Sequence, residues 1–154
     1  MNISHMDFSP DARFLACSGH RGFTLWDLER RESILARSVP PGEGSIAYSP
    51  GGREIALAAY EFIQVWNVAS GVQRQSLVGH QQLVRCLAYS PDGTILASGG
   101  LDRTVRFWDI DSGGLRRTYD WKIGPVHAIA FAPDGLTCAA GGESGEVVIW
   151  DVED

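Results

Sequence analysis

Residues 79–109 read GHQQLVRCLAYSPDGTILASGGLDRTVRFWD. Two short apolar, β-prone segments, 83–89 and 94–98, flank the turn sequence Ser90-Pro91-Asp92-Gly93. In such a turn Pro fixes φ, Asp can accept a hydrogen bond from its own backbone, and Gly tolerates positive φ. The stretch therefore predicts two antiparallel strands joined by a tight turn.

The residues that follow extend this hairpin. A second tight turn is expected at 99–103, and the alternating residues 104–109 predict a third strand. After another turn at 111–114, residues 115–119 predict a fourth strand that is more polar, as suits an outer edge. No segment of useful length has a helical period, because Pro or Gly interrupts each candidate. The unit is a four-stranded meander.

The same unit recurs along the chain. Tryptophan returns at intervals of 40, 42 and 42 residues, each time followed by an acidic or amide residue: Trp26-Asp27, Trp66-Asn67, Trp108-Asp109 and Trp150-Asp151. Each tryptophan lies 16 or 17 residues after the proline of a turn: Ser9-Pro10-Asp11, Ser49-Pro50-Gly51-Gly52, Ser90-Pro91-Asp92-Gly93 and Ala132-Pro133-Asp134-Gly135. Two landmarks in fixed phase indicate one supersecondary unit used four times.

These motifs resemble the WD40 repeat family, in which GH, SPDG, LASGG and WD occur in this order. The resemblance covers essentially the whole chain. It implies an all-β fold, a β-propeller whose four-stranded antiparallel blades are arranged around a central channel. We expect one domain, 1–154, with four blades at approximately 3–41, 42–79, 80–121 and 122–154.

The resemblance also implies a hydrogen-bonded tetrad inside a blade, formed in the third copy by His80, Ser98, Asp102 and Trp108. A buried indole N–H needs an acceptor and a buried carboxylate needs donors, so the pattern is physically sensible. The other copies depart from it, with Cys17, His20 and Trp26 in the first, Leu57, Tyr60 and Trp66 in the second, and Lys122, Ala140, Ser144 and Trp150 in the fourth. Only the third blade is expected to hold a complete tetrad.

The blade count suggests an incomplete ring. Ile3 aligns with the first strand of a blade, and the chain ends soon after the third strand of the fourth, so that blade is expected to lack an outer strand. The resemblance implies closed rings of about seven or eight blades, and four would leave an apolar face uncovered at each end. Three interpretations stay open. Two chains could pair head-to-tail into an eight-bladed ring, which we favour; the chain could be a piece, natural or engineered, of a longer propeller; or four blades could close alone.

Composition limits the classes of partner and the cellular compartment that we expect for this protein. The net charge of −6 argues against a general phosphate-binding surface, so no nucleic-acid partner is expected. The first residues do not look like a signal peptide and no apolar stretch approaches a membrane span, so no membrane partner is expected. Cys17, Cys86 and Cys138 all fall inside predicted strands, which suggests buried, reduced thiols in a cytoplasmic protein.

The sequence offers no recognisable catalytic or metal-binding motif. No nucleophile elbow, phosphate-binding loop or paired cysteine spacing is present, so we expect no enzyme activity, no cofactor and no metal site. His5 and His127 fall in innermost strands and could face the channel as an ion-binding pair. A histidine with a backbone partner is the more ordinary interpretation.

The exposed turns remain as the candidate functional surface. The resemblance implies that partners bind on the face formed by the turns between second and third strands and before first strands. The candidate partner-binding residues there are His20, Tyr60, Leu101, Arg103, Trp121 and Glu143. We therefore expect a non-catalytic scaffold that binds a protein or peptide and completes its propeller as a homodimer. A half-propeller whose only activity is assembly is the alternative, and a propeller enzyme or small-ligand binder is a weaker one.

Overall fold

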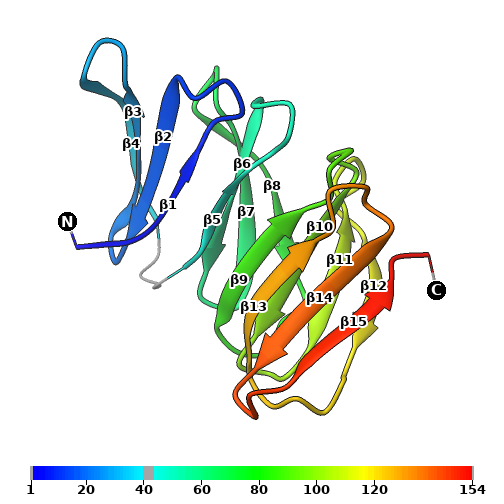
Figure 1. The fold of residues 1–154 in the computed structure, drawn as a ribbon. Coiled ribbons are helices and arrows are strands. Elements are labelled where there is room, and N and C mark those ends of the chain that lie inside the picture. The colour runs from blue at the N-terminus through cyan, green and yellow to red at the C-terminus, as the bar shows by residue number, and fades with distance from the viewer. Residues whose placement is uncertain (1, 40–43, 154) are drawn as a thin grey trace.

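The computed structural model describes residues 2–39 and 44–153. Every regular element in these ranges is a β-strand, and the strands form four antiparallel sheets (Figure 1). The all-β propeller-type fold predicted from the repeats is confirmed.

Each sheet is built from strands that follow one another along the chain. The first contains β1 (Ile3–Phe8), β2 (Phe14–Gly19), β3 (Gly22–Asp27) and β4 (Glu32–Ser38). The second contains β5 (Ile46–Tyr48), β6 (Glu54–Ala59), β7 (Phe62–Asn67) and β8 (Val72–Val78). The third contains β9 (Val84–Tyr89), β10 (Ile95–Gly100), β11 (Val105–Asp109) and β12 (Leu115–Tyr119). The fourth contains β13 (Val126–Phe131), β14 (Thr137–Gly142) and β15 (Val147–Asp151). The last sheet has three strands within the described ranges.

The turn between the first and second strands forms for the reason that its sequence suggests. In the third sheet, Ser90 donates from Oγ to Asp92 Oδ1 over 2.6 Å and accepts from the Ile95 N–H over 3.0 Å. Asp92 also accepts from the Thr94 N–H, and Gly93 takes a φ of 75° that disfavours other residues. These contacts fix the first residue of β10 and thereby its register with β9.

The sheets pack face to face, and the core lies between them rather than within any one sheet. Three apolar clusters of buried residues form, one at each junction between consecutive sheets. One side of each sheet carries the repeat tryptophan, and we call it the tryptophan face. The other side carries two apolar residues, three and one positions before that tryptophan, and we call it the pair face: Phe23 and Leu25, Ile63 and Val65, Val105 and Phe107, Val147 and Ile149. At each junction a tryptophan face packs on the pair face of the preceding sheet.

The four sheets form an open arc. The first and last sheets lie at opposite ends of it (Figure 1). The tryptophan face of the first sheet and the pair face of the last are both exposed, with Met6, Trp26, Val147 and Ile149 open to solvent. The interpretation in which four blades close alone is therefore wrong, because closure would bury these two faces against each other.

Candidate functional site

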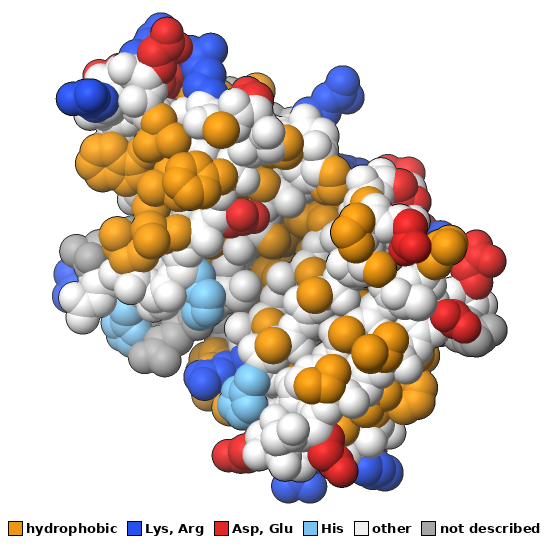
Figure 2. All heavy atoms as spheres, in the orientation of Figure 1, with side chains coloured by type: hydrophobic (Ala, Val, Ile, Leu, Met, Phe, Trp, Pro, Cys, Tyr) orange, Lys and Arg blue, Asp and Glu red, His pale blue; other side chains and the backbone are white. Residues whose placement is uncertain are grey.

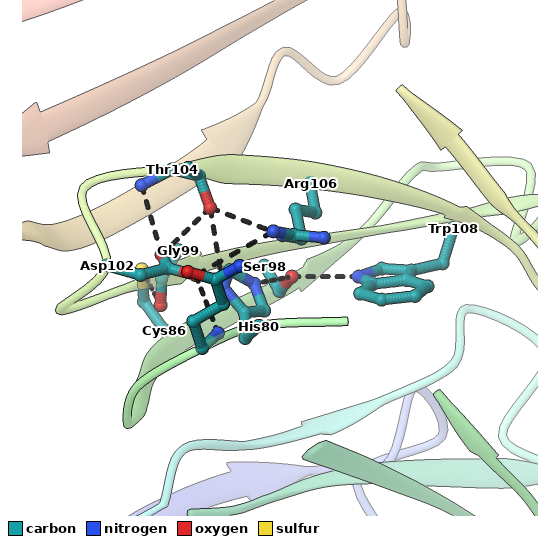
Figure 3. Close-up of polar contacts among 9 residues, drawn as sticks. His80, Cys86, Ser98, Gly99, Asp102, Thr104, Arg106 and Trp108 are labelled. Carbon is teal, nitrogen blue, oxygen red and sulfur yellow. Dashed lines mark hydrogen bonds and ion pairs between the residues drawn. The ribbon is translucent and has the colours of Figure 1, made fainter. Parts of the chain in front are cut away.

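The predicted tetrad residues meet in the third sheet (Figure 3). His80 Nε2 lies 2.7 Å from Ser98 Oγ, and Trp108 Nε1 donates to the same Oγ over 2.8 Å. On the other side of the ring, His80 Nδ1 lies 2.8 Å from Asp102 Oδ2. His80, Ser98 and Trp108 are buried. The chain of contacts joins the segment before β9 to β10, the β10–β11 turn and β11.

The hydrogen-bond partners of His80 indicate which of its ring nitrogens carries the proton. An ionised carboxylate only accepts, so His80 Nδ1 carries the proton that Asp102 binds, and Nε2 then accepts from the Ser98 hydroxyl. Burial by itself raises the pKa of Asp102, but the hydrogen bonds from His80, the Gln81 N–H and Thr104 hold that pKa well below its ordinary value of 3.8. Asp102 is therefore a structural anion.

Asp102 also organises the turn that carries two candidate binding residues. Its Oδ1 accepts from the Thr104 hydroxyl over 2.8 Å and from the Thr104 N–H over 3.1 Å. Its Oδ2 accepts from the Gln81 N–H over 3.0 Å. Arg103 sits in this turn with a φ of 68°, and the Leu101 N–H donates to the Leu83 carbonyl over 2.9 Å. The buried network thus fixes the backbone of an exposed loop.

A groove lies between this turn and the corresponding turn of the fourth sheet. Its volume is about 490 Å³, and its lining residues are Gln82, Leu101, Asp102, Arg103, Pro125 and Glu143. The two walls are held in the same way, because the Glu143 N–H donates to the Pro125 carbonyl over 2.9 Å as the Leu101 N–H does to Leu83. The lining combines the apolar Leu101 and Pro125 with one cation, Arg103, and two carboxylates, Asp102 and Glu143.

The structure brings together three of the six candidate partner-binding residues, Leu101, Arg103 and Glu143. Pro125 was not foreseen as part of the site. Pro125 directly precedes β13, just as Leu83 directly precedes β9. This equivalence between repeats was the sequence feature that could have indicated it.

The other three candidates lie outside the groove. Tyr60 is exposed in the β6–β7 turn with a φ of 61°, and its carbonyl accepts from the Val84 N–H over 2.6 Å. His20 is exposed in the β2–β3 turn. Trp121 is 37% exposed, and its ring stacks on Tyr119 with centroids 5.4 Å apart. Its ring is therefore part of an aromatic cluster between the third and fourth sheets.

The indole N–H groups of Trp66 and Trp150 have different surroundings from that of Trp108. Trp66 Nε1 donates to Gln64 Oε1 over 3.2 Å. Sequence reasoning missed Gln64, although residues two apart on a strand share a face. Trp150 Nε1 is buried without a hydrogen-bond partner among the described residues, since Ala140 stands where the third sheet has Ser98.

In the first three sheets, the residue after the repeat tryptophan caps the turn toward the outer strand. Asp27 Oδ1 accepts from the Arg30 N–H, Asn67 Oδ1 from the Ser70 N–H and Asp109 Oδ1 from the Ser112 N–H, each over 2.9 Å. An amide oxygen serves as well as a carboxylate in this role, which explains Asn67. Asp151 is exposed at the end of β15.

The thiols and histidines present no obvious reactive centre. Burial raises the pKa of Cys86 and Cys138 to about 12, and it also raises that of Cys17, so all three stay protonated. Cys86 points its thiol at the Gly99 carbonyl beneath the tetrad (Figure 3). His5 and His127 are exposed, and residues 2–39 and 44–153 contain no group of three or more potential metal ligands.

Comparisons with known proteins agree with the repeat pattern. The family model described as "WD domain, G-beta repeat" matches residues 1–27, 71–109 and 114–151. The chain is 35% identical over 107 residues to a WD repeat-containing protein of Synechocystis sp., covering 68% of this chain and 31% of the relative. It is 31% identical over 106 residues to the serine-threonine kinase receptor-associated protein of Dictyostelium discoideum, covering 68% of this chain and 36% of the relative. The chain thus spans about a third of the length of these relatives.

Membrane crossing by a helix has no support in the structure. Across the two described ranges, no helix has the length and apolar character needed to span a bilayer.

Proposed function

Because the chain belongs to the WD40 repeat family, which is generally non-catalytic, we propose that it is a protein-interaction scaffold that carries out no reaction of its own. Family membership supports the interaction role in general. Its partner is a protein or peptide, and neither nucleic acid nor membrane is part of the proposal.

The groove between the third and fourth sheets carries this proposal. It brings together an apolar side chain, Leu101, an exposed cation, Arg103, and an exposed anion, Glu143. Backbone hydrogen bonds hold both of the turns that carry these residues. A rigid binding surface loses little conformational entropy when a partner binds. An extended peptide that places an apolar residue between an acidic and a basic one would complement this lining.

Two further features belong to the proposal. We place the protein in the cytoplasm, which the three free, buried cysteines favour. We also propose that the chain self-associates to complete its ring, because association would bury the apolar sheet faces that are exposed at both ends of the arc.

Peptide selection tests the groove. We expect phage-displayed peptides selected on the immobilised protein to lose roughly tenfold or more in affinity for Arg103→Glu, because charge reversal places like charges across the contact. Arg53→Glu, which reverses an exposed arginine outside the groove, serves as the control and should bind normally. Isothermal titration calorimetry measures each Kd.

Two results would contradict the groove as the binding site. One is a selection that enriches no peptide, which would favour the assembly-only alternative. The other is a set of peptides whose affinity falls equally in both variants.

A further inference from the structure

The three junctions between sheets repeat a single contact. At the first, the ring of Trp66 meets that of Phe23 edge-on, with centroids 5.2 Å apart. At the third, Trp150 stacks on Phe107 with centroids 6.1 Å apart. At the second, Trp108 shares a cluster with Ile63 and Val65. Each tryptophan face is therefore shaped to receive a pair face.

The pair face of the last sheet has no such cover. Phe23, Leu25, Ile63, Val65, Val105 and Phe107 are all 0–1% exposed. Val147 and Ile149 hold the same positions relative to their tryptophan and are 68% and 69% exposed. Both are branched aliphatic side chains on a regular strand, and the equivalent buried positions likewise hold only large apolar residues. The pair face of the last sheet is therefore as apolar as the pair faces that are buried.

The tryptophan face of the first sheet is the matching half. Trp26 is 40% exposed, whereas Trp66, Trp108 and Trp150 are 1–9% exposed. Beside Trp26 is a hollow of about 400 Å³, whose lining is nearly all apolar: Ile3, Met6, Leu15, Cys17, Trp26 and Leu28, with Asp27 and Arg31 completing it. In Figure 2, hydrophobic side chains gather over the first sheet and others lie over the last.

We propose that a second copy of this chain covers both faces, with Val147 and Ile149 of one copy seated against the Trp26 hollow of the other. This inference rests on the proposed self-association and specifies its surface. The occupant follows from complementarity: the chain carries one unfilled tryptophan face and one unfilled pair face, the two halves of a contact that it already makes three times.

The polarity of the contact decides the form of the assembly. A tryptophan face meets a pair face, so copies join head-to-tail, in the same sense in which one sheet follows another within the chain. In this proposal the contact is used twice around a two-fold axis, so that two copies leave neither end face open. The product is a ring of two chains.

Light scattering with a matched pair of variants tests the surface. The wild-type mass should approach twice 16.8 kDa, and Val147→Glu should weaken association by roughly 100-fold or more, because it buries a carboxylate in an apolar contact. Val78→Glu is the control: Val78 is 73% exposed on β8, away from either end face, and this variant should stay dimeric. Both residues are exposed in the single chain, so circular dichroism should show both variants folded.

Mixing two blocked variants tests the head-to-tail polarity. Trp26→Asp and Val147→Glu should each be monomeric alone, because each lacks one half of the contact. Together they retain one intact tryptophan face and one intact pair face, and an equimolar mixture should form a one-to-one heterodimer. The heterodimer makes the contact once where the wild-type ring makes it twice, so it should need a higher protein concentration. A mixture that associates no more than either variant alone, up to the highest soluble concentration, would overturn the proposed polarity.

The outcomes separate this inference from the proposed self-association. A wild-type mass that stays at 16.8 kDa overturns both proposals. A wild-type dimer that Val147→Glu leaves intact overturns the end-face contact alone, since association would then use another surface.

Discussion

Trp108→Ala is expected to lower the free energy of unfolding by about 3–5 kcal/mol, as for other large aromatic side chains deleted from a packed core. Trp108 is 1% exposed and packs against Leu96 and the pair face of the second sheet. The site is shaped to the ring: a Cβ at Gly79 would lie 3.0 Å from Trp108 Cη2. Urea-induced unfolding followed by circular dichroism measures the loss.

Two controls separate the causes of this loss. Trp26→Ala removes the equivalent side chain from an exposed face, and in the Val147→Glu background, which prevents self-association, it should cost much less. Trp108→Phe retains most of the ring but removes the N–H that donates to Ser98, so it should cost about 1 kcal/mol for the lost hydrogen bond, besides any change in packing. Equal losses for Trp26→Ala and Trp108→Ala would contradict the packing scheme.

Asp102→Asn is expected to lower the free energy of unfolding by about 1–3 kcal/mol at neutral pH, because His80 Nδ1–H loses a charged acceptor within a buried network. Asp102→Ala and His80→Ala should be at least as costly, since each leaves buried partners unpaired. Asp134→Ala is the control: this aspartate is exposed in a turn and should matter little. Thermal melts at fixed pH compare the four variants.

The effect of Asp102 should depend on pH in one direction only. Its folded pKa lies below the ordinary value of 3.8, so its ionised form stabilises the fold above that value. As the pH falls below 3.8 toward the folded pKa, the unfolded chain takes up the proton first and this stabilisation is lost. The difference in unfolding free energy between wild type and Asp102→Asn should therefore be constant near neutrality and shrink in acid. A difference that grows in acid would contradict the assigned charge state.

Much of the fold could be predicted from the sequence because the information is local. The Ser90–Gly93 turn, the strand alternation around it and the period of the tryptophans all rest on residues close together in the chain. Part of the site was predictable for the same reason. The partners of the tetrad lie within one repeat, at spacings that a single sheet fixes, and the structure brings His80, Ser98, Asp102 and Trp108 into contact.

Other polar contacts needed the three-dimensional arrangement. The sequence predicted an incomplete tetrad beside Trp66, but not that Gln64 would turn its amide oxygen to the indole N–H. It placed Trp121 among the candidate binding residues, and the structure leaves this side chain exposed, but the sequence did not predict that its ring would stack on Tyr119. Rotamer choice and stacking depend on neighbours that local sequence does not specify.

The sequence by itself determined the repeating unit, its turns, its strand order and the composition of its two faces, since each follows from side chains a few residues apart. Only the tertiary structure decided which of those faces are covered, which candidate residues share a groove and that the arc stays open. Those properties depend on how consecutive sheets are placed against one another. The positions of Leu101 and Arg103 opposite Glu143, and of Val147 in solvent while Val105 is buried, are set by packing between sheets rather than within one.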